Sequence, residues 1–167
     1  MRSFCLTALA TWLLAVTSAA ADEGPFLKSL AGEWTGGGMM KRSTSSSPIN
    51  LNCSFQSKAN GEVFSMNGTC RGMIVVSREV SAQLTATDNQ YAGSYIGPSG
   101  GVSGLQGKRS GDAINLAVRW SRIINGDRSA NMTIQRVNAN TIRIQTIDKD
   151  PTSGERVITS ELNLRRD

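Results

Sequence analysis

The sequence of 167 residues contains no histidine, and this absence excludes several kinds of site. A Ser-His-Asp triad, a Cys-His pair, a histidine-ligated haem and the usual catalytic zinc sites all need an imidazole. Charge is also modest, with 19% charged residues against 39% hydrophobic ones, a balance typical of folded chains. The length fits a single domain.

Long hydrophobic runs are also missing, apart from one short run at the start. Arg2 is followed by an apolar stretch of 13 residues from Phe4 to Val16, and then by small residues ending in Ala19-x-Ala21. This order is typical of a secretory signal peptide. A buried helix or a membrane anchor is the alternative, but crossing a bilayer takes about 20 apolar residues. We therefore expect a signal peptide at 1–21. Residues 22–167 should form one periplasmic or secreted domain without a transmembrane segment.

Two of the three cysteines, Cys53 and Cys70, lie outside that segment. Two cysteines in an exported domain usually form a disulfide, and two buried thiols are the alternative. A two-residue turn at Asn60-Gly61 would set Cys53 opposite Gly68 and diagonal to Cys70, farther than a disulfide usually spans. A bridge therefore needs a β-bulge, with Gly68 as candidate, or a four-residue turn that sets the cysteines opposite each other.

Apolar and polar residues alternate along most of residues 33–165, as in half-buried antiparallel strands. Ile158, Leu162 and Leu164, for example, are expected to share an inner face. Turn-forming residues separate the stretches too closely for a crossover helix. Strands are expected near 33–42, 49–57, 62–71, 73–87, 90–97, 102–110, 113–123, 129–137, 140–148 and 156–165. The predicted fold class is therefore all-β. An open meander would leave two unpaired edges, so the sheet is expected to close on itself. We expect an antiparallel up-and-down β-barrel of about 8–10 strands with a short N-terminal helix.

The most specific motif runs from Leu30 to Gly38 and reads Leu-Ala-Gly-Glu-Trp-Thr-Gly-Gly-Gly. The short predicted helix, with Phe26 and Leu27 on its apolar face, leads directly into it. A helix followed by Gly-x-Trp and a glycine-rich strand resembles the opening of the calycin barrels. These include lipocalins, fatty-acid-binding proteins and nitrobindin-like barrels.

The resemblance implies structural roles for four residues. Trp34 would close the barrel floor, and Gly32 would let the chain turn sharply from helix into strand. Arg165 or Arg166, at the end of the last strand, would pack across the indole in a cation–π contact. Nitrobindins hold haem through a histidine late in the chain, which this sequence lacks. Haem binding is therefore not implied, and no cofactor is expected.

Larger side chains on the alternating inner face are expected to line a cavity. The predicted ligand-binding residues are Phe64, Met66, Tyr95, Trp120 and Arg122. Arg122, in phase with Trp120, would point inward and meet a ligand carboxylate, as basic residues do inside fatty-acid-binding barrels. The alternatives are plain core packing for Trp34 and Trp120, and a strand that ends near Ser121 and leaves Arg122 in solvent.

Acidic residues are scattered near turns and form no convincing acid–base pair, so no catalytic residue and no enzyme activity are expected. Two cysteines without a histidine also argue against a metal site. The predicted function is an exported, non-enzymatic barrel that binds a small apolar or amphipathic ligand.

Two other functions stay open: a protein-interaction module such as a protease inhibitor, and an envelope protein that contacts anionic lipid or polysaccharide. The basic residues are spread along the chain without a dense run, so a nucleic-acid partner is not expected. The barrel interior discriminates between these functions. A filled barrel favours interaction through loops, and an open cavity with convergent polar groups favours a ligand.

Overall fold

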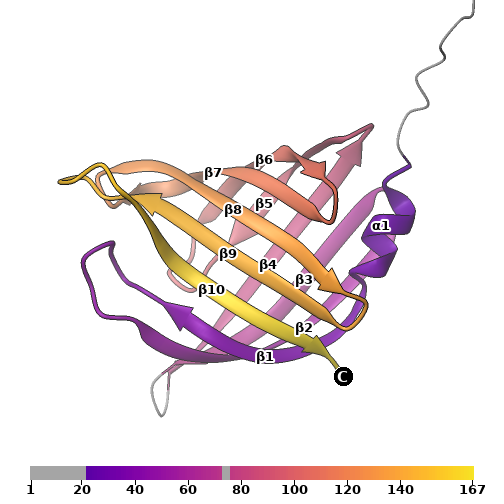
Figure 1. Cartoon of the computed structure of the whole chain (residues 1–167), viewed down its shortest axis with the longest axis horizontal. Coiled ribbons are helices and arrows are strands. Elements are labelled where there is room, and N and C mark those ends of the chain that lie inside the picture. The colour runs from indigo at the N-terminus through magenta and orange to yellow at the C-terminus, as the bar shows by residue number, and fades with distance from the viewer. Residues whose placement is uncertain (1–21, 73–75) are drawn as a thin grey trace, which may run out of the picture.

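The computed structural model describes residues 22–72 and 76–167, so the predicted signal peptide at 1–21 lies outside the described residues. The predicted all-β class is confirmed, because ten antiparallel strands form a closed barrel with one short helix (Figure 1). The elements are α1 (Gly24–Ser29), β1 (Gly32–Met40), β2 (Ile49–Asn60), β3 (Val63–Gly72), β4 (Val76–Thr87), β5 (Gln90–Ile96), β6 (Val102–Ser110), β7 (Ala113–Ile124), β8 (Asp127–Asn138), β9 (Thr141–Lys149) and β10 (Arg156–Arg166).

The barrel closes where β1 pairs with β10, and every other pairing joins neighbours in sequence. Strands therefore alternate in direction, and the connections gather at two ends. The end that carries α1 and the tight turns at 61–62, 88–89, 111–112 and 139–140 is called the closed end. The opposite end, with the connections 41–48, 97–101, 125–126 and 150–155, is called the open end (Figure 1).

The β2–β3 hairpin differs from the two-residue turn expected at Asn60-Gly61, and its register is the alternative one, with the cysteines opposite each other. It turns at Gly61-Glu62 instead of Asn60-Gly61, because Gly61 takes a left-handed φ of +56° at the first turn position. Cys53 then lies directly opposite Cys70, and the predicted disulfide joins them with a Cα–Cα distance of 4.1 Å. The expected bulge at Gly68 is wrong, since the β2–β3 ladder runs without a register shift. The Phe55 ring lies across Gly68, where an added Cβ would be 2.4 Å from Cδ1.

A bulge does occur in β10, and it overturns the expected orientation of Ile158. The pairing with β9 shifts between Ile158 and Ser160, so Thr159 is an extra residue in the strand. Alternation is interrupted there. Thr159 turns inward and is 6% exposed, whereas Ile158 is 38% exposed on the outer face.

Trp34 fills the barrel at the closed end and is buried. Its indole Nε1 donates hydrogen bonds to the carbonyl oxygen of Leu30 at 3.1 Å and to Ser57 Oγ at 2.9 Å. The Ser57 hydroxyl in turn donates to the same Leu30 carbonyl at 2.6 Å. One side chain therefore joins the end of α1 to the interior of β2.

Arg166 covers the outer side of this indole, with its guanidinium carbon 4.3 Å from the ring centroid. It also donates to the carbonyl oxygens of Ser29 at 2.9 Å and Ala31 at 2.5 Å. Arg165, the other candidate for this contact, is exposed. Gly32 has a φ of +142°, and a Cβ there would lie 2.2 Å from the Arg166 guanidinium. A side chain at position 32 would therefore displace the arginine from the ring.

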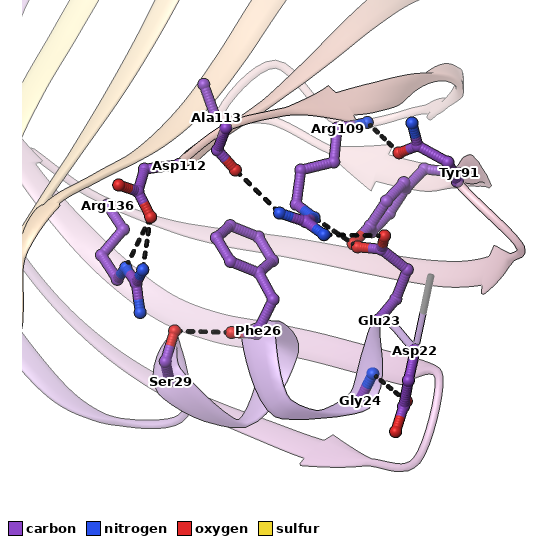
Figure 2. Close-up of polar contacts among 12 residues, drawn as sticks. Asp22, Glu23, Gly24, Phe26, Ser29, Tyr91, Arg109, Asp112, Ala113 and Arg136 are labelled. Atoms are coloured by element: carbon purple, nitrogen blue, oxygen red, sulfur yellow. Dashed lines mark hydrogen bonds and ion pairs between the residues drawn. The ribbon is translucent and has the colours of Figure 1, made fainter. Parts of the chain in front are cut away.

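A second contact at the closed end joins the start of the described chain to β5 and β6 (Figure 2). The carboxylate of Glu23 is fully buried and accepts hydrogen bonds from Arg109 Nε at 2.6 Å and Nη2 at 3.1 Å. The Tyr91 hydroxyl donates to it at 2.5 Å. Burial alone would raise the pKa of Glu23, but these hydrogen bonds outweigh it and hold that pKa below its ordinary value. Burial and the Glu23 carboxylate raise the pKa of Tyr91.

Phe26 of α1 fills the space beside this ion pair. Its ring lies between two guanidinium groups, 4.8 Å from Arg109 and 5.5 Å from Arg136. Arg136 is held in place by an ion pair with Asp112 (Figure 2). Together with Trp34, these contacts plug the closed end of the barrel.

Candidate functional site

A cavity of about 800 Å³ opens at the unplugged end of the barrel. This volume is within the range of small-molecule binding sites. Fully buried inward side chains, including Phe64, Leu84 and Ile114, fill the closed half of the barrel and leave this space at the other end. Its apolar wall includes Met40, Ile49, Leu51, Val80 and Leu162.

The charged residues that line the cavity are separated by sign. Lys41, Arg42, Arg78 and Arg122 lie at the mouth, where strands and loops meet at the open end. Arg78 is opposite Cys70 in register and in phase with the inward residues of β4, so its inward orientation follows from the strand period. Among the residues that the structure describes, the single acidic lining residue is Asp148, which is 3% exposed. The site therefore has a basic rim and one buried carboxylate in its wall.

Asp148 is held by side chains from two other strands. Thr159 donates a short hydrogen bond to one carboxylate oxygen, and Trp120 Nε1 donates to the other at 3.3 Å. The bulge in β10 turns Thr159 inward to make this contact. The nearby hydroxyl residues Ser103 and Thr146 are buried in the same cavity wall.

Trp120 reaches Asp148 from an irregular part of β7. Pairing with β8 shifts between Arg119 and Ile124, so several residues of β7 face a single residue, Arg128. The guanidinium of Arg128 donates to the carbonyl oxygens of Trp120 and Ser121 at 2.8 Å each, in place of the missing ladder bonds. This bulge sets the indole in the cavity wall and Arg122 at the mouth.

Three of the five predicted ligand-binding residues line the cavity. Tyr95 and Trp120 stand side by side in the wall with ring centroids 6.2 Å apart, and burial raises the pKa of Tyr95 to about 12. Arg122 is exposed at the mouth, and β7 continues past it to Ile124 instead of ending near Ser121.

Phe64 and Met66 do not line the cavity, which corrects their expected placement. Phe64 lies opposite Ala59 and Leu84, close to the β2–β3 turn, and is therefore part of the packed closed end. Met66 is two residues further along the same inner face and is also buried. The strand period gave the correct face for both residues but did not give their height in the barrel.

Sequence reasoning missed Asp148, although a signal for it was present. Ile142, Ile144, Thr146 and Asp148 follow one another at every second position of β9 and share the inner face. A carboxylate in phase with inward apolar residues marks a polar group inside a barrel. Thr159 carried no such signal, because its inward position depends on the bulge.

Within the described residues, 22–72 and 76–167, no group of three or more acidic, cysteine or histidine side chains lies close enough to hold a metal ion. No helix in this part of the chain is long and apolar enough to cross a membrane.

Two solved structures share the fold. Rv2717c from M. tuberculosis superposes with a TM-score of 0.66 at 15% identity, over 89% of this chain and 99% of that one. The S-type phycobiliprotein lyase CPES from Guillardia theta superposes with a TM-score of 0.59 at 12% identity, over 88% and 93% of the two chains. At these identities the likeness shows a common barrel fold. Comparison with protein-family models and with curated protein sequences found no match.

Proposed function

We propose that this protein is an exported, non-enzymatic barrel of the calycin type that binds a small amphipathic molecule in its open-end cavity. The observation that carries the proposal is the cavity of about 800 Å³ with an apolar wall and a basic rim. An apolar body would pack against Leu51, Val80 and Leu162, and an anionic group would meet Arg78 or Arg122 at the mouth.

Two features support this function over an interaction module such as a protease inhibitor, and two others bear on export and on catalysis. The barrel is closed, so it offers no free sheet edge for another chain to pair with. The cavity is open, whereas a filled barrel would leave only the loops for interaction. The Cys53–Cys70 disulfide suits an oxidising compartment, in agreement with the signal-peptide pattern of residues 1–21. The single lining carboxylate offers no acid–base pair, which favours binding without catalysis.

The first test fills the cavity and measures binding of a neutral naphthylamine dye by its fluorescence. Val80→Trp combined with Leu162→Trp places two indoles in the cavity and should weaken dye binding about tenfold. The matched control is Glu79→Trp combined with Asn163→Trp, because these exposed neighbours add the same groups outside the barrel. Equal dye binding by both double variants would place the dye elsewhere and contradict the proposal.

Native mass spectrometry of the protein purified from its own host should then show a bound small molecule. Because one fold neighbour is a lyase, the molecule should also be released and its mass compared with that of the free compound. Release of an unchanged compound supports binding without chemistry. A protein found altered by covalent attachment of the compound would contradict the non-enzymatic part of the proposal.

The rim of the cavity favours a second function, contact with an anionic lipid surface. Ile96 and Val102 lie opposite each other where β5 and β6 meet the open end, and both are exposed. Ile123 is 70% exposed at the mouth, which the bases Lys41 and Arg42 also line. Apolar side chains next to basic ones suit a membrane with anionic headgroups, which would give an amphipathic ligand a short path into the cavity.

This contact is tested with flotation of the protein on vesicles of phosphatidylcholine, with and without phosphatidylglycerol. We expect binding to the anionic vesicles that falls several-fold in Ile123→Asp and in Lys41→Ala with Arg42→Ala. Val137→Asp is the control, because Val137 is also exposed but lies at the closed end. Binding that is indifferent to phosphatidylglycerol, or equal losses in Ile123→Asp and Val137→Asp, would reject the second function.

A further inference from the structure

The barrel contains two buried carboxylates that differ in how fully they are compensated. Glu23 at the closed end faces the guanidinium of Arg109 and the hydroxyl of Tyr91. Asp148 in the cavity wall receives hydrogen bonds from Thr159 and Trp120, both of which are neutral donors. In the described ranges the ion pairs are Arg109–Glu23 and Arg136–Asp112, and neither involves Asp148.

A carboxylate accepts about four hydrogen bonds, and each oxygen of Asp148 has one donor. Buried carboxylates in folded proteins are normally paired with a cation or saturated with donors. Asp148 lines the cavity, and Thr159 and Trp120 are the side-chain donors that its carboxylate has among the described residues. A bound molecule is therefore the group that can complete the site.

The surroundings of Asp148 are built to hold it in one place. Thr159 is turned inward by the β10 bulge, and Trp120 is set by the β7 bulge that Arg128 stabilises. Two departures from regular strand geometry thus converge on one carboxylate. No ion pair joins Asp148 to the basic rim among the described residues, so a ligand that reaches both meets opposite charges.

Building on the proposed function, we infer that Asp148 recognises a positively charged nitrogen of the ligand, such as an ammonium or a protonated heterocycle. The expected ligands are then a subset of the amphipathic molecules considered above. It is an apolar body that carries a cationic nitrogen against the wall, with room for an anionic group at the rim. A charge-assisted hydrogen bond is stronger than a neutral one, and in a water-poor wall this difference selects between headgroups.

The inference is tested by headgroup preference, measured as displacement of the neutral naphthylamine dye. Decylamine and decanol share one chain and differ in charge. The wild-type protein should bind decylamine at least about tenfold more tightly than decanol. Asp148→Asn keeps the shape and should lose most of this preference while decanol binding stays unchanged. Asp127→Asn is the control, since it removes the same charge from the open end but does not line the cavity.

The outcomes separate this inference from the proposed function. If decanol and decylamine bind equally well to the wild type, cation recognition is wrong and the binding barrel stands. If neither compound nor the dye binds, the proposed function fails and the inference fails with it. If Asp148→Asn weakens both compounds equally, Asp148 only holds the wall in place and the inference is overturned. Should this variant fold poorly, the wild-type preference for decylamine over decanol decides, together with the same comparison in Asp148→Glu, which keeps the charge and should keep the preference.

Discussion

Replacing Trp34 by alanine should lower the free energy of unfolding by about 3–5 kcal/mol, as expected for a large buried side chain. The substitution empties the floor of the barrel and removes the donor to the Leu30 carbonyl and Ser57. It also leaves the Arg166 guanidinium without the ring that it covers. Urea denaturation followed by far-ultraviolet circular dichroism measures the loss, because the variant lacks the Trp34 fluorescence.

The terminal arginines provide a matched pair of controls for this plug. Arg166→Ala should cost about 1–2 kcal/mol through lost stacking and packing. Arg165→Ala should stay within about 0.5 kcal/mol, because that side chain is exposed. A Trp34→Ala variant as stable as the wild type, or equal costs at the two arginines, would show that the closed end does not depend on the indole.

Replacing Glu23 by glutamine should cost about 2–3 kcal/mol, because it leaves the Arg109 guanidinium without its anion in a buried setting. Glutamine can still accept a hydrogen bond from Tyr91, so the cost is smaller than that of removing the side chain altogether. The control is Asp22→Asn, which changes the neighbouring exposed carboxylate and should stay within about 0.5 kcal/mol. Denaturation at neutral pH measures both changes.

The stabilisation that the Glu23–Arg109 ion pair contributes should decrease at low pH. The pKa of Glu23 in the folded state lies below its ordinary value of 4.5, so the unfolded chain takes up the proton first as pH falls. The stabilisation is present in full above the ordinary pKa and is lost as pH falls through the lowered one. The stability curves of the wild type and Glu23→Gln should therefore converge in acid. A gap that widens toward low pH would contradict the assignment.

The strand period predicted the fold because one barrel face is buried throughout. Alternation located all ten strands, and the helix followed by Gly-x-Trp located the plugged end. Local geometry was harder to predict. The turn at Gly61-Glu62 differs from one at Asn60-Gly61 by a single position, and both contain glycine next to a polar residue. That position decides whether Cys53 and Cys70 are opposite or diagonal.

The candidate site was predicted in part, for a physical reason. Tyr95 and Trp120 were found because aromatic residues in phase with a buried face must lie inside. Phe64 satisfies the same rule and lies in the packed end, because the sequence period carries no information on height along the barrel. Thr159 and the pairing of Glu23 with Arg109 depend on a bulge and on a contact between distant segments. Neither the inward position of Thr159 nor this pairing produces a periodic pattern in the sequence.

The pairing of β1 with β10 has a consequence for the order of events during folding. Thr35 donates a hydrogen bond to Asp167 at 2.5 Å across a separation of 132 positions, next to the Trp34–Arg166 contact. Contacts between residues so far apart make folding slow, since the intervening chain must be ordered before they form. The barrel cannot close until β10 has been synthesised, so earlier intermediates keep two open edges. For a chain exported as we propose, this delay would keep the chain unfolded while it passes through a translocation pore. Folding would then be completed after export.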